Sequence, residues 1–237
     1  MKKVIELKYK YNKSSLEHES SIRIEALAKN IGAIIKQLCP SARKGLDIGC
    51  QRGQITDIIS SDTNITFYGI EPDPNEVLHC LKSVTVIHGH AEDLPFPDST
   101  FDVITVISVI EHISPINLKA SLYEIFRALK PGGYCIGQIP NMNFPIEVHS
   151  RLPFQQFLPG KIKDKYLNIF KGKDLKTEWY RTSIKKVSRL ASEVGFDGIF
   201  TVPFLYPREL FPKRLLPLYP VLKIFPLDYV FWFRKGQ

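Results

Sequence analysis

Short apolar runs alternate with segments of helical periodicity between residues 43 and 140, and no other feature of the sequence restricts the fold as strongly. The runs lie at 45–50, 65–70, 83–88, 101–107 and 134–139. The run at 101–107 is almost uninterrupted, which is typical of a parallel strand that is covered on both faces. Five such alternations predict a doubly wound, mostly parallel α/β sheet with helices on both faces.

The helices expected between these runs carry recognisable end signals. Ser114 is placed as an N-cap and Pro115 as the first helical residue of a helix that the sequence at 130–133, Lys-Pro-Gly-Gly, closes. Before the alternation, apolar residues recur at helical spacing from Ile24 to Leu38 and predict an N-terminal helix.

Periodicity is lost after Pro140 and returns with a predicted helix at 182–194. Two late strands are expected at 199–202 and 229–233. We therefore interpret the chain, 1–237, as one domain in four parts. These are an N-terminal helical extension (1–42), a cofactor-binding core (43–140), an acceptor-side insertion (141–181), and a C-terminal helix with the last strands (182–237).

Composition excludes several classes of protein. Hydrophobic residues are 44% of the 237 residues and charged residues 24%, as in ordinary globular domains rather than disordered or fibrous chains. No apolar run approaches the ~20 residues that span a bilayer, and no apolar stretch follows the N-terminal lysines as in a secretory signal. The four cysteines lie too far apart in the sequence for a zinc clasp or a redox pair, so we expect reduced thiols, no metal and a cytoplasmic protein.

Charge is divided unevenly along the chain. Residues 1–141 hold 15 Lys and Arg against 16 Asp and Glu, whereas residues 142–237 hold 17 against 8. The excess positive charge therefore lies entirely in the second part. This pattern suits contact with an anionic small molecule, a lipid surface or nucleic acid, and a solvated lysine-rich face is the alternative.

Polar residues and glycines follow the first two predicted strands, where an open α/β sheet binds its ligand. After the first strand, Gly49 and Gly53 allow the backbone to approach a ligand closely. Glu71 ends the second strand, 22 residues after Gly49, and suits hydrogen bonding to two ribose hydroxyls. An ordinary strand-to-helix turn and a solvated carboxylate are the structural alternatives.

Five motifs in order resemble the class I S-adenosylmethionine-dependent methyltransferases, in the methyltransferase-11-like subgroup that acts on small molecules and lipid precursors. They are LDIGCQRG at 46–53, YGIEPD at 68–73, GHAEDLPFPDSTFDVI at 89–104, SVIEHI at 108–113 and LKPGG at 129–133. The resemblance implies a Rossmann-like, seven-stranded sheet with one antiparallel strand. It also implies S-adenosyl-L-methionine as the cofactor.

The resemblance further assigns roles on the methionine and ribose side. Gly49 and Gly53 would approach the methionine part of the cofactor, and Asp47 would fix this loop and the ammonium group. Glu71 would bind the ribose. The chain departs from the family at Gln51, where a third glycine is usual and where a side chain narrows the approach to the cofactor.

On the adenine side, the resemblance places Ala91 and Glu92 at the border of the purine. His90 stands where the family usually has an acidic residue, and its ring can still donate or accept a hydrogen bond at the purine edge. Ser108 would lie beneath the transferred methyl group.

Residue chemistry favours this cofactor over NAD. A sulfonium cofactor suits carboxylates such as Asp47 and Glu71, whereas a pyrophosphate prefers a glycine-rich turn without nearby negative charge. Methyl transfer depends mainly on alignment, so a base is needed only if the acceptor keeps its proton. We consider Glu111, His112 and His149 as candidates for that base. His112 at a helix entry and Glu111 at a helix N-terminus also have purely structural explanations.

The acceptor is expected to be a small or lipid-linked molecule, and the positive charge of the second part of the chain suits an anionic one. Nucleic-acid amines are disfavoured because the Asn/Asp-Pro-Pro-aromatic turn of such enzymes is absent after the fourth strand. Aromatic and basic residues are mixed at 204–235, which suits peripheral contact with an anionic membrane, and packing of these aromatics on the sheet is the alternative. A non-catalytic methyltransferase-fold protein, associated with RNA through its basic half, is the second hypothesis.

Overall fold

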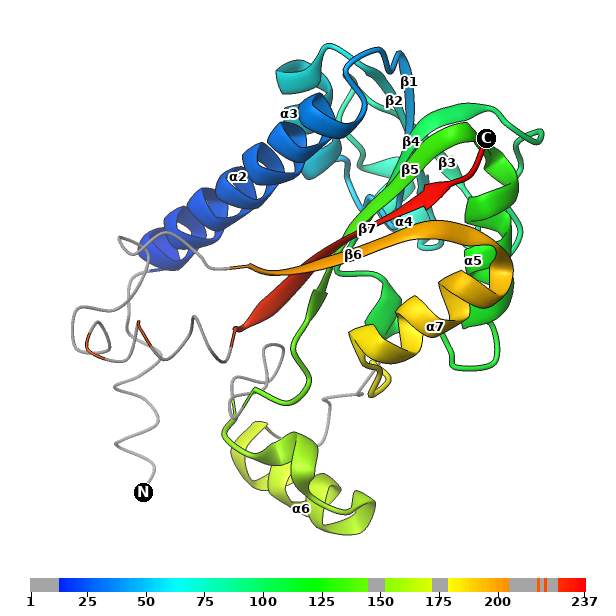
Figure 1. The fold of residues 1–237 in the computed structure, drawn as a ribbon. Coiled ribbons are helices and arrows are strands. Elements are labelled where there is room, and N and C mark those ends of the chain that lie inside the picture. Colours follow the sequence, from blue (N-terminus) through cyan, green and yellow to red (C-terminus); the bar gives the residue numbers. More distant parts are fainter. Residues whose placement is uncertain (1–12, 145–151, 172–178, 205–216, 218–219, 221–225) are drawn as a thin grey trace.

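The computed structural model describes residues 13–144, 152–171, 179–204, 217, 220 and 226–237 (Figure 1). Seven strands form one sheet in the order β3-β2-β1-β4-β5-β7-β6. The strands are β1 (Lys44–Ile48), β2 (Thr66–Glu71), β3 (Thr85–His88), β4 (Phe101–Ile107), β5 (Leu129–Pro140), β6 (Phe196–Phe204) and β7 (Asp228–Lys235). Only β7 runs antiparallel to its neighbours, β5 and β6. The predicted mostly parallel, seven-stranded Rossmann-like sheet is confirmed.

Helices cover both faces of the sheet (Figure 1). The α-helices are α2 (Lys13–Leu38), α3 (Gln54–Thr63), α4 (Pro74–Leu78), α5 (Leu118–Ala128), α6 (Gly160–Lys171) and α7 (Ile184–Val194), and the short 3-10 helices are η1 (Ile110–His112) and η2 (Gln155–Phe157). None of the helices in the described part of the chain combines the length and the apolar character that crossing a membrane requires.

The central strand β4 shows why its sequence is almost continuously apolar. Val103 and Ile107 pack with α2 and α3 on one face of the sheet. Ile104 and Val106 pack with α5 and α7 on the other face. Successive side chains of a strand point to opposite faces, so a strand between two helical layers must be apolar at both sets of positions.

Two local predictions are wrong. The sequence predicts no helix between 141 and 181, yet α6 occupies Gly160–Lys171. Pro159 and Gly160 stand at its start, where a missing backbone N–H costs nothing. The helix α5 begins at Leu118 with Asn117 as its cap. The backbone carbonyl of Ser114 accepts hydrogen bonds from the N–H groups of Asn117 and Leu118, and it belongs to the turn that precedes the helix.

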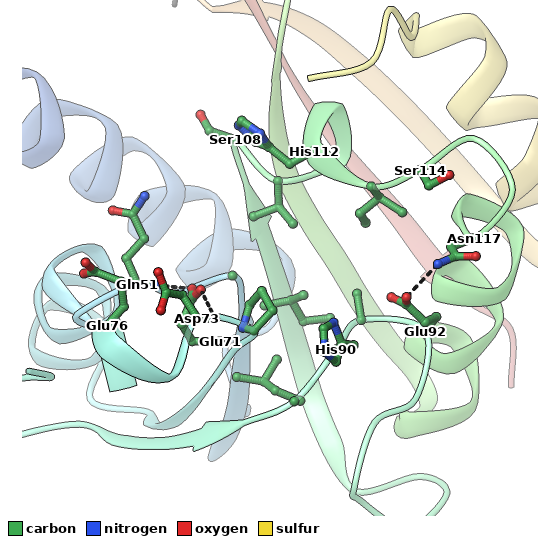
Figure 2. A pocket seen from close by; sticks show the side chains of 18 of the residues that line it. Gln51, Glu71, Asp73, Glu76, His90, Glu92, Ser108, His112, Ser114 and Asn117 are labelled. Atoms are coloured by element: carbon green, nitrogen blue, oxygen red, sulfur yellow. Dashed lines mark hydrogen bonds between the residues drawn. The ribbon is translucent and has the colours of Figure 1, made fainter. Parts of the chain in front are cut away.

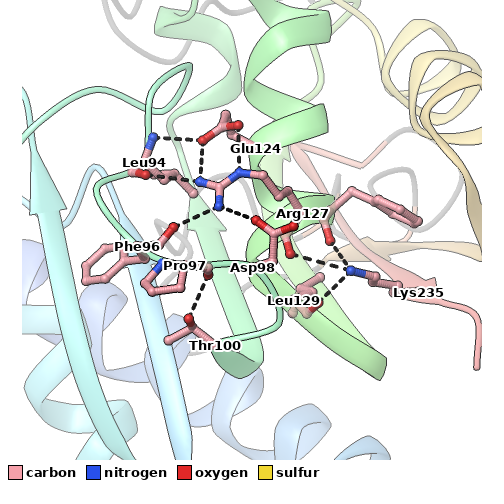
Figure 3. A network of polar contacts seen from close by, with 10 residues as sticks. Leu94, Phe96, Pro97, Asp98, Thr100, Glu124, Arg127, Leu129 and Lys235 are labelled. Atoms are coloured by element: carbon pink, nitrogen blue, oxygen red, sulfur yellow. Dashed lines mark hydrogen bonds and ion pairs between the residues drawn. The ribbon is translucent and has the colours of Figure 1, made fainter.

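At the amino end of β4, Arg127 near the end of α5 contacts the loop that precedes this strand (Figure 3). Its guanidinium contacts the carboxylates of Glu124 (2.7 Å) and Asp98 (2.8 Å) and donates to the carbonyl oxygens of Leu94 (3.1 Å) and Phe96 (2.8 Å). One side chain therefore holds the loop before β4 against α5.

All four cysteines are free thiols. Burial raises the pKa of Cys39 and of Cys135 to about 12, so neither is a thiolate near neutral pH.

Candidate active site

A pocket of about 710 Å³ opens at the carboxyl ends of the parallel strands (Figure 2). It lies where the strand order reverses, since β1 stands between β2 and β4. The loops after β1, β2, β3 and β4 line it, together with Tyr180 from the segment that precedes α7. Of the eight predicted cofactor-binding residues, the lining includes Gly49, Glu71, His90, Ala91, Glu92 and Ser108.

Gly49 is required by the loop after β1. It has a φ of 67°, and a Cβ at this position would overlap the side chain of Val109. Its N–H donates to the carbonyl of Ile70 (2.8 Å). Gly53 also has a positive φ, but it caps α3 beside Val84 and does not line the pocket. The two predicted glycines are thus separated: one reaches the pocket and the other shapes the turn.

Glu71 ends β2 and is buried, with one edge facing the pocket. Its Oε2 accepts from the backbone N–H of Gln51 (2.8 Å), and its Oε1 accepts from that of Asp73 (3.0 Å). Each carboxylate oxygen can accept a second hydrogen bond. Glu71 therefore joins two loops of the pocket and keeps capacity for ligand hydroxyls.

Gln51 replaces the third glycine of the loop without closing it. The residue adopts a left-handed conformation, with a φ of 49°, as a glycine would at this position. Its side chain is exposed, and Figure 2 shows the amide pointing away from Glu71. The side chain of Gln51 therefore narrows the space for the cofactor only slightly on the side of Glu71, where the ribose is expected.

Asp47 lies deeper than the resemblance implies. Its carboxylate accepts from the hydroxyls of Thr56 (2.5 Å) and Thr105 (2.6 Å), and the residue is only 3% exposed. Burial raises the pKa of Asp47 to about 6, which the two hydroxyls partly offset. Asp47 borders a second hollow of about 400 Å³, which shares Gly49 and Ser108 with the main pocket.

The adenine side of the pocket is formed by the turn at 90–93. His90 pairs with Asp93 across this turn, and Ala91 is buried. Glu92 accepts a hydrogen bond from the side-chain amide of Asn117 (2.7 Å), which ties the turn to the start of α5 (Figure 2). The turn is thus fixed from outside, and the ring of His90 is left exposed at the pocket.

Ser108 stands at the opposite wall of the pocket, close to His112 (Figure 2). Ser108 has a φ of 54°, and its hydroxyl donates to the side-chain oxygen of Gln138 (2.5 Å). The amide of Gln138 in turn donates to Asp228 of β7 (2.8 Å). Gln138 and Asp228 are buried, so these hydrogen bonds link the antiparallel strand β7 to the exposed Ser108 at the pocket wall.

The structure separates the three candidates for a base. His112 is exposed and lines the pocket. Glu111 has no exposed surface and does not line the pocket, because η1 turns its side chain inward. This placement argues against contact between Glu111 and an acceptor. His149 lies outside the described residues.

Several lining residues were not predicted from the sequence. Asp73 and Glu76 lie at the start of α4, Asn117 precedes α5 beside the adenine-side turn, and Tyr180 comes from the acceptor-side insertion. Asp73 follows Glu71 by two residues and has the signal of an N-cap before Pro74, so it could have been found. Tyr180 carries no comparable signal, because it lies near the end of the insertion at 141–181, where no strand or helix is predicted.

The charge of the pocket is its clearest chemical property. Its described lining contains four carboxylates, Glu71, Asp73, Glu76 and Glu92, and neither a lysine nor an arginine. Arg52 lies in the neighbouring hollow, where it pairs with Glu76 (2.8 Å). Such a lining favours a ligand that carries positive charge and hydroxyl groups.

Comparison with known proteins supports the same assignment. Residues 46–137 match the family described as a methyltransferase domain. The chain is 33% identical over 160 residues to a probable S-adenosylmethionine-dependent methyltransferase of Mycolicibacterium smegmatis, a match that covers 66% of this chain and 53% of that protein. It is 31% identical over 109 residues to a ubiquinone/menaquinone biosynthesis C-methyltransferase of Vibrio campbellii, covering 40% of this chain and 41% of that one. The chain thus spans about half the length of these relatives or less.

A solved structure shows the same fold at low sequence identity. Phosphoethanolamine N-methyltransferase 2 of Haemonchus contortus, in complex with S-adenosyl-L-methionine, superposes with a TM-score of 0.61 at 18% identity, over 88% of this chain and 53% of that one. The family match, the relatives and the strand order agree. Residues 46–137 are therefore a methyltransferase domain that is similar to those of the class I S-adenosylmethionine-dependent methyltransferases.

Proposed function

We propose that the chain binds S-adenosyl-L-methionine in the main pocket and transfers its methyl group to an oxygen or carbon atom of a small or lipid-linked acceptor. The observation that carries this proposal is the acidic lining, which has four carboxylates and no cationic side chain among the described residues of the main pocket. A pyrophosphate cofactor such as NAD would meet repulsion there, whereas a sulfonium with an ammonium group is favoured.

When bound, S-adenosyl-L-methionine supplies a methyl group on a positively charged sulfur, so that a nucleophile can take the methyl as the carbon–sulfur bond breaks. The residues of the chain mainly bind and orient. Glu71 suits the ribose hydroxyls, because each of its oxygens has accepted one backbone N–H and retains a lone pair. The turn held by Asn117 and Glu92 suits the adenine.

His112 is the proposed proton acceptor for a protonated nucleophile. Its ring lies at the wall of Ser108, across the pocket from Glu71 and His90 (Figure 2). A neutral imidazole ring can accept a proton from such a nucleophile. The printed name of the Vibrio campbellii relative supports a carbon atom of a quinone-like acceptor as one candidate. A location on the cytoplasmic side, peripheral to the membrane, belongs to the same proposal.

Calorimetry tests the cofactor. We expect S-adenosylhomocysteine to bind wild-type protein and NADH not to bind. The variant Asp197→Asn also removes a carboxylate, but an exposed one that does not line the pocket, so it should bind S-adenosylhomocysteine like wild type. Absence of S-adenosylhomocysteine binding would favour the non-catalytic, RNA-associated alternative.

A labelled methyl donor tests the transfer. The protein is incubated with the donor and with metabolite and lipid extracts, and label is followed into products. We expect His112→Asn to lower turnover by about 100-fold while the affinity for S-adenosylhomocysteine changes little. Equal turnover in His112→Asn would remove this residue from the mechanism.

A further inference from the structure

The segment at 204–235, expected to meet a membrane, is largely internal where the structure describes it. Phe204, Phe231 and Phe233 are buried, and Phe231 and Phe233 belong to the core between the sheet and its helices. The residues 205–216, 218–219 and 221–225 lie outside the described part of the chain. Among the described residues of this segment, these aromatic side chains therefore pack within the protein, which was the alternative to membrane contact.

Exposed apolar side chains gather elsewhere, on η2 and α6. Five large ones lie within 17 positions and are between 47% and 64% exposed. They are Phe154, Phe157, Ile162, Ile169 and Phe170. Single exposed apolar residues are normal on a protein surface, but a group of this density marks an interaction surface.

The apolar residues of α6 share one face of the helix. Ile162, Tyr166, Ile169 and Phe170 recur at the spacing i, i+4, i+7 and i+8, and the rings of Tyr166 and Phe170 lie 4.9 Å apart. Leu167, which is buried, lies off the centre of this face. The exposed face is therefore left over after the helix has made its own packing contact.

Positive charge adjoins this face. Lys161 and Lys165 are exposed on the neighbouring side of α6, and Asp164 is the helix's one acidic residue. The insertion at 141–181 holds eight Lys and Arg against four Asp and Glu. An amphipathic helix with lysines beside its apolar face has the pattern of a helix that lies in the interface of an anionic membrane.

We propose that η2 and α6 dock on a membrane surface that carries anionic lipids. Figure 1 shows α6 apart from the layers of the sheet, at the end of the molecule, where a flat surface can approach it. The apolar face enters the interface between headgroups and acyl chains, and the lysines contact lipid phosphates. A protein partner is the less suitable occupant, because the positive charges flank the apolar residues as a lipid surface requires.

The docking surface is connected to the pocket, and this step rests on the proposed function. Past α6 the chain returns to the pocket at Tyr180, whose backbone N–H donates to the carbonyl of Glu111 in η1 (2.6 Å). Arg181, beside Tyr180, lies over the ring of Phe157 in η2 (5.7 Å). A membrane bound at η2 and α6 would therefore present a lipid-linked acceptor to the acceptor side of the pocket.

Vesicle co-sedimentation tests the proposal. Wild-type protein is mixed with vesicles of phosphatidylcholine alone or of equimolar phosphatidylcholine and phosphatidylglycerol, at low and high salt. We expect binding only to the anionic vesicles, and weaker binding at high salt. Lys161→Glu with Lys165→Glu, and separately Ile162→Ser with Phe170→Ser, should each weaken binding by more than about tenfold.

Matched variants on other exposed surfaces serve as controls. Lys185→Glu with Arg189→Glu on α7, and Phe200→Ser with Val202→Ser on β6, change the same properties away from α6 and should bind vesicles like wild type. Equal binding by all variants, or no preference for anionic vesicles, would overturn the proposal. A dimer in sedimentation velocity that Ile162→Ser with Phe170→Ser abolishes would overturn it in favour of a second copy of the chain.

Calorimetry separates this proposal from the proposed function. The α6 variants should bind S-adenosylhomocysteine like wild type, since none of the substituted residues lines the pocket. Intact cofactor binding without vesicle binding contradicts only the docking surface. Vesicle binding without cofactor binding contradicts only the proposed methyl transfer.

Discussion

The two ends of the strands, which we call the amino edge and the carboxyl edge of the sheet, differ in how their carboxylates are paired. At the amino edge, carboxylates have cationic partners: Lys130 lies 2.6 Å from Asp102, and Arg127 contacts both Glu124 and Asp98 (Figure 3). These contacts lower the pKa of Glu124, with the hydrogen bond from Arg127 as the main cause. The charges at this edge largely cancel.

At the carboxyl edge, most carboxylates bond to neutral groups instead. Glu71 accepts from backbone N–H groups, Asp47 from threonine hydroxyls and Glu92 from an amide. Among the acids that line the main pocket, Glu76 is paired with Arg52. Negative charge thus remains largely uncompensated at the carboxyl ends of the strands, where we propose that the cofactor binds, and it is neutralised at the amino ends. The difference indicates that the amino edge serves stability and the carboxyl edge serves binding.

The largest effect is expected for Glu71→Ala. Two charge-assisted hydrogen bonds to ligand hydroxyls would be lost, at roughly 2 kcal/mol each, so the dissociation constant for S-adenosylhomocysteine should rise about a thousandfold. Calorimetry measures it, and thermal unfolding shows whether the variant is folded. A folded Glu71→Ala variant that binds S-adenosylhomocysteine like wild type would contradict the conclusion that the carboxyl edge serves binding.

The variant Asp47→Asn tests whether Asp47, at the same edge, affects the stability of the fold or the binding of the cofactor. The raised pKa of Asp47 means that the folded protein binds a proton more tightly than the unfolded chain between about pH 4 and pH 6. Wild-type stability therefore falls as the pH rises through this range, and Asn removes the penalty because the hydroxyls of Thr56 and Thr105 can also pair with an amide.

We expect the free energy of unfolding of Asp47→Asn to exceed that of wild type by an amount that grows by about 3 kcal/mol between pH 4 and pH 7. Urea unfolding at several pH values measures this difference. The dissociation constant for S-adenosylhomocysteine should change by only about threefold. A loss of affinity as large as that of Glu71→Ala would show that Asp47 contacts the cofactor's ammonium group directly.

Arg127→Met tests the amino edge. The substitution keeps the aliphatic stem but removes the contacts to Glu124, Asp98 and the carbonyl of Phe96, and it should lower the free energy of unfolding by about 2 kcal/mol. Arg189→Met is the control, because its exposed ion pair with Glu193 is long (3.7 Å) and worth little.

Cofactor affinity gives Arg127→Met a second readout. Because the lost contacts lie at the far edge, the dissociation constant for S-adenosylhomocysteine should stay within about threefold of wild type. An equal loss of stability in both arginine variants, or a large loss of affinity in Arg127→Met, would contradict the division of roles between the edges.

The sequence predicts the parts of the molecule in which local signals and burial agree. The strand β4 was expected at 101–107 and has those bounds, because both of its faces are buried and both must be apolar. Glu71 is placed in the pocket because residues that follow parallel strands meet at one end of the sheet, and Ser108 is placed there by the resemblance to the methyltransferase family.

Features that depend on distant contacts could not be predicted. Asp47 follows the family motif, yet its two oxygens are occupied by Thr56 on α3 and Thr105 on β4, and only the folded structure brings these together. Tyr180 reaches the pocket from the end of the insertion at 141–181. The helix α6 is a different case, because its apolar residues Ile162, Tyr166, Ile169 and Phe170 recur at helical spacing and the local signal is present in the sequence.

The smallest effect is expected for Lys235→Met at the end of β7. Lys235 donates to the carbonyl oxygens of Phe126 (2.8 Å) and Leu129 (2.7 Å), and so it caps the C-terminus of α5 (Figure 3). Methionine retains the contact with the ring of Phe126 but leaves these carbonyls without the ammonium, which should lower the free energy of unfolding by about 1 kcal/mol. Urea unfolding measures the change beside Lys185→Met, an exposed control. If Lys235→Met unfolds like this control, the amino edge is held by Arg127 and Lys130 alone.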